Sequence, residues 1–181
     1  DTAKEGGDVS DHPLAGKGSS VSSRRSTTKQ KQILGSFFGQ RFCAVRHTPG
    51  KPLVLPFPAR PFHAMIHTAE AMQDRAIRQM GLELLRTGMR YALCHGCEAA
   101  KVGDVLDELI DVNHFAFEGH TAYTSVHAEE PLAEAIEYFI LPAGLAETGL
   151  LVIVGDEDHF RSVLREFDQV TAPLGERILS K

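Results

Sequence analysis

The chain has 181 residues, of which 43% are hydrophobic and 24% are charged, and its net charge is −5. This content suffices for one domain with a buried core, because domains typically hold roughly 100–200 residues. No run of about 18 apolar residues occurs, which excludes a membrane-spanning helix on pattern alone. The chain has three cysteines, which are few and cannot all pair, so a disulfide scaffold is not expected. We expect a cytoplasmic protein in a reducing environment.

The charge is divided unevenly along the chain. Residues 1–60 carry ten Lys or Arg against four Asp or Glu, whereas residues 61–181 carry nine against twenty, giving nets of +6 and −11. An acidic body repels nucleic acid and anionic lipid, so such contacts would fall to the basic arm. Its cations lack interleaved aromatic residues, which disfavours nucleic-acid binding. They are Arg24, Arg25, Lys29 and Lys31.

The first 60 residues are predicted to be an extension of the domain. Residues 1–32 are rich in Gly, Ser, Thr and Lys, which is typical of a disordered arm. Residues 33–60 are predicted to dock this arm and to contain a candidate β-hairpin with its turn at 48–51. Phe37, Phe38 and Phe42 follow helical spacing, and we interpret them as packing residues or as a surface that binds a partner.

Residues 61–181 are predicted to form an α/β domain. Strands are expected at 62–66, 89–94, 121–127 and 150–154, each followed by an amphipathic helix. Such βα units have right-handed crossovers, which produce a mostly parallel sheet covered by helices. The fold predicted is a small three-layer sandwich of four βα units, preceded by the candidate hairpin and the basic arm.

A histidine stands close after each of the four predicted strands. Loops after parallel strands gather at one edge of the sheet, where ligands commonly bind. The candidate residues at this edge, called the rim here, are His67, His95, His127, Glu129, Asp156 and His159. Such side chains could hold zinc or carry acid–base chemistry near neutral pH. They could equally be polar loop residues and helix caps.

Cys94 and Cys97 form a C-x-x-C pair where a strand passes into a helix. That is where thioredoxin-like proteins keep a redox pair, because the helix N-terminus lowers the thiol pKa. The same pair with two histidines could bind zinc. A third interpretation is that Cys94 is a buried strand residue and Cys97 a small residue at a helix start.

Three stretches together resemble a family of small uncharacterised bacterial domains. They are Cys94-His95-Gly96-Cys97-Glu98, the segment from Thr124 to Ile136, and Leu151-Val152-Ile153-Val154-Gly155-Asp156. The resemblance covers roughly residues 61–168. It implies an α/β fold and no particular activity.

The sequence favours a non-enzymatic protein-interaction or regulatory module, since no complete catalytic signature is present. Its partner would be another protein or a second copy of the chain. The first alternative is a metal-binding protein or a small hydrolytic or transfer enzyme with its site at the carboxyl edge of the sheet. The second is a thiol redox protein that uses the C-x-x-C pair. No cofactor is firmly implied, and zinc is the metal that would fit.

Overall fold

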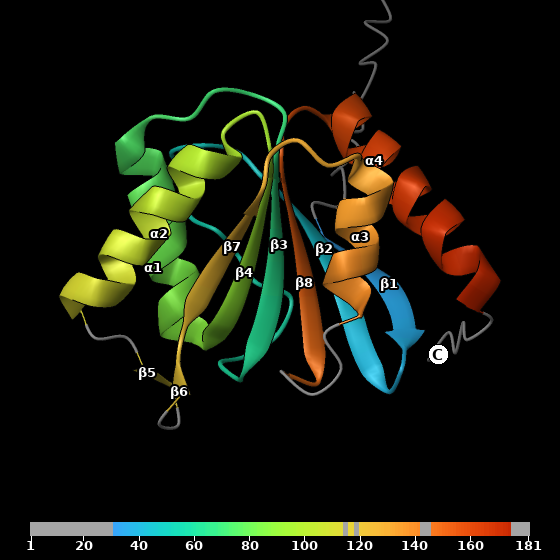
Figure 1. The fold of residues 1–181 in the computed structure, drawn as a ribbon, viewed down its shortest axis with the longest axis horizontal. Helices are drawn as coiled ribbons and strands as arrows, with labels where there is room; N and C mark the ends of the chain where they lie inside the picture. The colour runs from blue at the N-terminus through green and yellow to red at the C-terminus, as the bar shows by residue number, and fades with distance from the viewer. Residues whose placement is uncertain (1–30, 114–115, 118–119, 142–145, 175–181) are drawn as a thin grey trace, which may run out of the picture.

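A computed structural model describes residues 31–113, 116–117, 120–141 and 146–174 (Figure 1). Residues 1–30 of the predicted arm lie outside the described residues. The elements in chain order are β1 (Lys31–Phe37), β2 (Gln40–His47), β3 (Phe62–Thr68), α1 (Asp74–Thr87), β4 (Met89–Gly96), α2 (Ala99–Asn113), β5 (Ala116–Phe117), β6 (His120–Thr121), β7 (Tyr123–His127), α3 (Leu132–Ile140), β8 (Thr148–Val154), α4 (Glu157–Thr171) and the 3₁₀ helix η1 (Ala172–Leu174). In the described part of the chain, no helix has the length and apolar character that a bilayer crossing requires.

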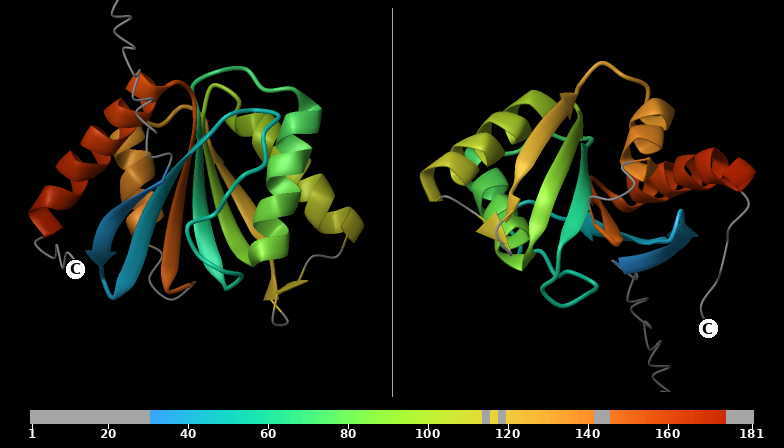
Figure 2. Two further views of the ribbon diagram at one scale, coloured as in Figure 1. Left: turned by 180° about the vertical axis from the view of Figure 1, so that it is seen from behind. Right: turned by 60° about the horizontal axis from the view of Figure 1, so that its bottom comes forward.

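The main sheet has six strands in the order β1-β2-β8-β3-β4-β7. The pair β1–β2 is antiparallel, and every other neighbouring pair is parallel. Helices α1 and α2 cover one face, and α3 and α4 cover the other (Figures 1 and 2). The predicted three-layer α/β architecture is therefore confirmed, with β7 parallel to β4 at one edge of the sheet.

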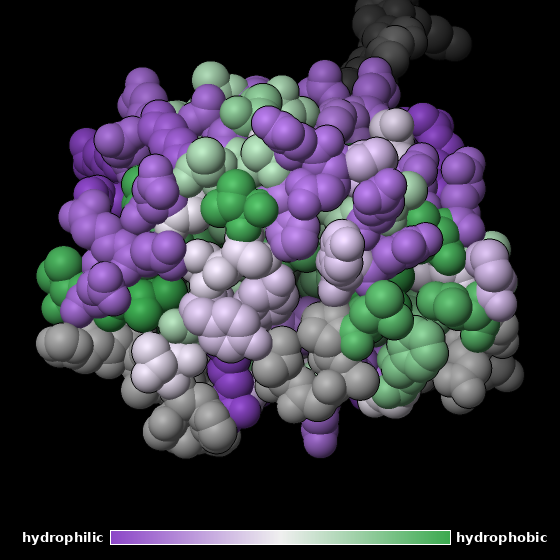
Figure 3. All heavy atoms as spheres, viewed as in Figure 1, coloured by the Kyte–Doolittle hydropathy of each residue, from purple (hydrophilic) through white to green (hydrophobic). Residues whose placement is uncertain are grey.

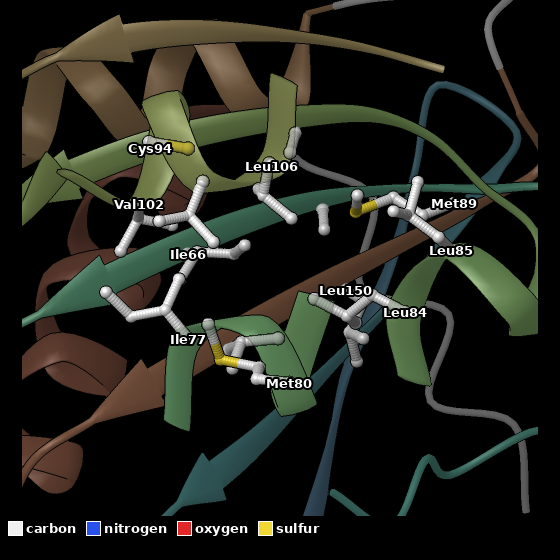
Figure 4. Close-up of a cluster of buried hydrophobic side chains, with 14 of the residues drawn as sticks. Ile66, Ile77, Met80, Leu84, Leu85, Met89, Cys94, Val102, Leu106 and Leu150 are labelled. Atoms are coloured by element: carbon white, nitrogen blue, oxygen red, sulfur yellow. The ribbon is translucent and has the colours of Figure 1, made fainter. Parts of the chain in front are cut away.

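Alternation along each strand creates two separate hydrophobic clusters. In β3, Ile66 packs toward α1 and α2, whereas its neighbour Met65 packs toward α3 and α4. Figure 4 shows part of the first cluster, in which Ile77 and Met80 of α1 approach the sheet. Each fully buried side chain of this size contributes about 1.5–3 kcal/mol. The helices are thus packed on both faces of the sheet, and the polar side chains at the strand ends are not part of these two hydrophobic clusters.

The prediction for residues 33–60 needs a correction. The helical spacing is wrong, because these residues form β1 and β2, joined at Phe38 and Gly39. Both turn residues have positive φ, 51° and 75°, as the two-residue turns favoured in hairpins require. Phe37 and Phe42 are 1% and 0% exposed, so their interpretation as partner-binding residues is wrong. Phe38 is 54% exposed and remains accessible.

A hairpin does precede the βα units, as predicted, but it is formed by β1 and β2, and the prediction that its turn lies at residues 48–51 is wrong. A turn does form there, closed by the bond that the amide of Lys51 donates to the carbonyl of Thr48 at 3.1 Å. The chain from 48 to 61 then contains no strand. Prolines at 52, 56, 58 and 61 remove the amide donors that a ladder needs. The strand that pairs with residues 40–47 in the hairpin precedes them in sequence.

Candidate acid–base site at the carboxyl edge of the sheet

The strand register places a row of polar residues across the carboxyl edge. Neighbouring strands pair His67 with His95, and His95 with His127. On the other side, His67 pairs with Ile153, which pairs with Arg46. Residues paired in this way lie side by side on the same face of the sheet. The row lies on the face that α3 and α4 cover.

His159 joins this row from the first turn of α4. The side chain of Asp156 caps that helix by accepting a bond from the amide of His159 at 2.8 Å. This cap fixes the first turn of the helix beside the end of β8. The Asp156 side chain is otherwise exposed, and the contact that the structure shows for it is this helix cap.

Three histidines form a continuous hydrogen-bonded chain, called the histidine chain below. Nδ1 of His67 lies 2.7 Å from Nδ1 of His95, and Nε2 of His67 lies 2.8 Å from Nε2 of His159. The ring centres are 4.9 and 5.0 Å apart, with small interplanar angles of 26° and 18°. Each centre separation exceeds the N–N distance by about two ring radii. The rings therefore meet edge to edge in nearly one plane, and do not stack face to face.

A backbone carbonyl determines which nitrogens of the chain carry protons. Nε2 of His95 lies 2.9 Å from the carbonyl oxygen of Glu130. A carbonyl can only accept, so this nitrogen donates, and Nδ1 of neutral His95 must accept. His67 then donates through Nδ1 and accepts through Nε2, which makes His159 the donor through its Nε2. Nδ1 of His159 is left as the unprotonated end of the chain.

This arrangement limits the charge that the histidine chain can hold. Each of the two N···N contacts needs one proton, and the contact with Glu130 needs another. Three neutral imidazoles supply these three protons. A fourth proton fits only at Nδ1 of His159, and a fifth would place two donors face to face. With all bonds intact, the chain is therefore neutral or singly charged.

The central imidazole is held neutral by its surroundings. His67 is 6% exposed, and burial lowers its pKa to about 3, with His95 and His159 lowering it further. Two other histidines in the sheet have lowered pKa values for the same first reason. Burial lowers the pKa of His63 to about 4, against a smaller opposing effect of the Phe139 backbone. Burial also lowers the pKa of His47, and nearby Glu83 opposes this.

His127 belongs to a neighbouring branch. Its Nε2 lies 3.0 Å from the hydroxyl of Ser125, which contacts the hydroxyl of Tyr91 at 2.5 Å. Its Nδ1 lies 3.3 Å from a carboxylate oxygen of Glu130, a contact outside hydrogen-bond geometry. Glu130 thus touches His127 through its side chain and His95 through its backbone.

The surroundings of the histidine chain are mostly acidic. Glu129, Asp156 and Asp158 are exposed at this edge, and Glu157 lies 3.3 Å from the guanidinium of Arg46. Hydrophilic side chains cover most of the upper half of the face shown in Figure 3, where the strands end in Figure 1. Negative charge nearby disfavours the binding of an anionic ligand at this edge.

The start of α2 is closed by backbone and hydroxyl contacts. Gly96 has φ 95°, and a Cβ there would lie 2.1 Å from the carbonyl oxygen of Thr68. That oxygen accepts the amide of Cys97 at 2.9 Å, and the Thr68 hydroxyl accepts the amide of Glu98 at 3.0 Å. Amides that would otherwise bind an anion at this helix start therefore already have partners.

The two cysteines of the C-x-x-C pair have opposite environments. Cys94 is fully buried in the cluster against α2, and burial raises its pKa to about 12 (Figure 4). Cys97 is exposed, and both thiols are free. A redox pair needs an accessible thiolate. The environment of Cys94 matches the interpretation of a buried strand residue, and the redox hypothesis stays a prediction.

The geometry does not gather the rim residues around one metal position. In the described ranges, no group of three or more His, Cys, Asp or Glu is arranged to hold a metal ion. His67 directs its two nitrogens to different neighbours, whereas ligands of one ion direct one nitrogen each to a common point. Zinc at the rim would require these rings to reorient, and it stays a prediction.

The structure brings together His67, His95 and His159 directly, and His127 through Glu130. Glu129 lies apart from the chain, where it lines an open surface depression with Glu130 and Glu134. The sequence reasoning missed the Glu130 carbonyl and Arg46. A carbonyl gives no sequence signal, but Arg46 lies near the end of a strand and could have been included with the rim.

The comparisons with known proteins give a family for the chain and no activity. No curated protein matches the sequence. A family model described as "Domain of unknown function (DUF7684)" matches residues 42–169, from within β2 to within α4, the helix of the last βα unit. The predicted resemblance to an uncharacterised domain family is confirmed, and it begins earlier than residue 61. Because the match covers well over half of the 181 residues, the chain belongs to the family DUF7684, a domain of unknown function.

Proposed function

We propose that the carboxyl edge of the sheet is the active site of a small enzyme that performs general acid–base chemistry, hydrolytic or group-transferring, on a small polar substrate. The observation that carries this proposal is the in-line chain from His159 through His67 to His95. The chain's one unprotonated end, Nδ1 of His159, is on a half-buried side chain. An accessible imidazole nitrogen with a defined tautomer is the group that general base catalysis requires.

The histidine chain would let the site take up a proton without any ring turning. When Nδ1 of His159 removes a proton from water or substrate, its Nε2 proton can pass to His67. The Nδ1 proton of His67 then passes to His95, which keeps its bond to Glu130. The positive charge moves away from the substrate in two short transfers. The reverse sequence returns the proton to a leaving group, so the same residues serve as base and as acid.

The environment supports this role in two ways. Asp156, Glu157 and Asp158 stand at the start of α4 with His159, the residue that first takes up the proton, and their carboxylates favour that uptake. Burial of His67 excludes water from the middle of the path.

Three free cysteines also fit a reducing compartment such as the cytoplasm.

The hydrolysis of p-nitrophenyl acetate, a general reporter of reactive imidazole, tests the proposal. We expect the full chain to accelerate hydrolysis and His159→Ala to lose most of this, roughly 100-fold for a lost general base. His127→Gln is the matched control, because His127 lies outside the chain and should retain the activity.

Two results of this assay would count against the proposal. Equal rates for the wild type and His159→Ala would show that Nδ1 of His159 is not the reactive group. Loss of the rate on adding a chelator would move the zinc alternative ahead of the imidazole chain.

An interaction module is the second candidate, and one observation favours it. β7 is an edge strand of the sheet, and Tyr123 and Val126 on it are 47% and 45% exposed. Tyr138 of α3 is also exposed. An edge strand with exposed apolar side chains can pair with a strand of another protein or of a second copy. A dimeric native mass that Tyr123→Lys converts to a monomer would favour this candidate.

A further inference from the structure

The opposite, amino-terminal edge of the sheet contains a cavity of about 770 Å³. Small-molecule pockets commonly measure roughly 300–1,000 Å³. The cavity is lined by residues that no part of the histidine chain touches. The residues that matter for its chemistry are Phe38, Gln40, Arg60, Pro61, Arg90 and Thr148.

The topology explains why these residues meet. Four adjacent strands begin at this amino-terminal edge, so their first residues lie side by side there. Gln40 begins β2, and its neighbour Arg41 pairs with Thr148, the first residue of β8. Pro61 immediately precedes β3, and Arg90 is the second residue of β4. The cavity is thus in part a product of the parallel register.

A β-bulge aims Arg90. Phe62 pairs with Met89, but the next residue, His63, pairs with Tyr91. Arg90 is therefore the extra residue between these two register pairs. Bulges commonly redirect a side chain near a binding site. Here the bulged residue is an arginine at a cavity wall.

Arg60 approaches from the adjoining segment and is held in place. Its amide donates to the carbonyl of Thr87 at 3.0 Å, and its guanidinium lies 5.7 Å from the ring centre of Phe57. Its Nε is buried and has no hydrogen-bond partner among the described residues. A buried guanidinium N–H without a partner is costly, and Arg60 itself lines the cavity wall.

We propose that this cavity binds a small organic oxyanion, a carboxylate or phosphate attached to an apolar group. Two guanidinium groups recognise such anions through paired, charge-assisted hydrogen bonds. Among the described wall residues, two are arginines, Arg60 and Arg90, and one is a carboxylate, Glu147. Thr148 offers a hydroxyl, and Phe38 and Pro61 offer apolar surface for the rest of the ligand. This site is separate from the carboxyl-edge site and does not depend on it.

Isothermal titration calorimetry on the full chain tests this proposal, with benzoate and phenyl phosphate as probes. We expect at least one probe to bind, and Arg60→Gln and Arg90→Gln each to weaken it about tenfold or more. Arg86→Gln is the matched control, because Arg86 is exposed at the last turn of α1 and outside the cavity wall. The preference between the probes identifies the anion class.

The proposal is overturned if neither probe binds, or if both cavity variants bind as the wild type does. Thermal unfolding of each variant verifies the fold. Arg60 precedes β3 and has no ladder role, so Arg60→Gln decides the question even if Arg90→Gln disturbs the bulge. His159→Ala should bind the probes normally, which keeps this test independent of the proposed acid–base function.

Discussion

Gly96→Ala is expected to destabilise the protein by about 3 kcal/mol or more. The residue has φ 95°, which side chains rarely adopt, and its new Cβ would lie 2.1 Å from the carbonyl oxygen of Thr68. That oxygen cannot move away cheaply, because it accepts the amide of Cys97 and belongs to the paired end of β3. Urea unfolding monitored by circular dichroism measures the loss.

Gly50→Ala is the matched control for this prediction. Gly50 also has a positive φ of 79°, but no atom lies within 4 Å of the position of its Cβ. It should therefore show only the conformational cost, about 1 kcal/mol. Equal losses for the two variants would contradict the close approach of Gly96 to Thr68. Failure of Gly96→Ala alone to accumulate as folded protein would agree with it.

Acidification from pH 7 to pH 5 is expected to lower the free energy of unfolding by about 4 kcal/mol. The folded-state pKa values of His63 and His67 are about 4 and about 3, below the ordinary value of 6.5. Above pH 6.5 both states are neutral, and stability is complete. As the pH falls from 6.5 toward those values, the unfolded chain binds protons at these histidines and the folded chain does not. The free energy of unfolding therefore decreases. Each histidine contributes about 2 kcal/mol by pH 5, and His47 adds in the same direction.

His63→Leu separates one contribution from the rest. His63 is fully buried, and in the described part of the structure neither ring nitrogen makes a hydrogen bond of good geometry, although the Phe139 backbone lies close enough to raise its pKa slightly. Leucine is similar in volume and cannot be protonated, so the acid loss should shrink by about half while the pH 7 stability is kept or raised. Urea unfolding at several pH values gives both quantities. A wild-type stability that stays flat between pH 7 and pH 5 would contradict the neutral, buried histidines.

The carboxyl edge could be predicted because a local pattern determined it. Four strand–helix pairs imply parallel strands, and His67, His95 and His127 each fall at or beside a strand end. Their side-by-side placement then follows from register. The position of β8 between β2 and β3 could not be predicted in this way, because strand order is set by packing of the whole domain. The contact between the Glu130 carbonyl and His95 could not be predicted either, because every residue has a carbonyl and only the packing of the domain brings this one to the ring.

The error in the hairpin has a local cause. Leu34 and Phe37 are three residues apart and both buried, a spacing that fits a helix better than a regular strand. The register of β1 shows why: Ile33 pairs with Cys43 and Gly35 pairs with Phe42, so Leu34 is the extra residue of a bulge. A bulge shifts the alternation by one position. The place of Arg90 at the cavity was missed for a similar reason, because no pattern in the neighbouring sequence predicts a bulge there.

The central claim is that His159, His67 and His95 form one neutral chain with fixed tautomers. Nitrogen-15 NMR of the imidazoles at pH 7.5 tests it most directly, because chemical shifts and couplings report which ring nitrogen carries the proton. We predict Nε2–H for His95, Nδ1–H for His67 and Nε2–H for His159, with His67 remaining neutral down to pH 5. A His67 ring that titrates near pH 6.5, or that exchanges between tautomers, would contradict the chain.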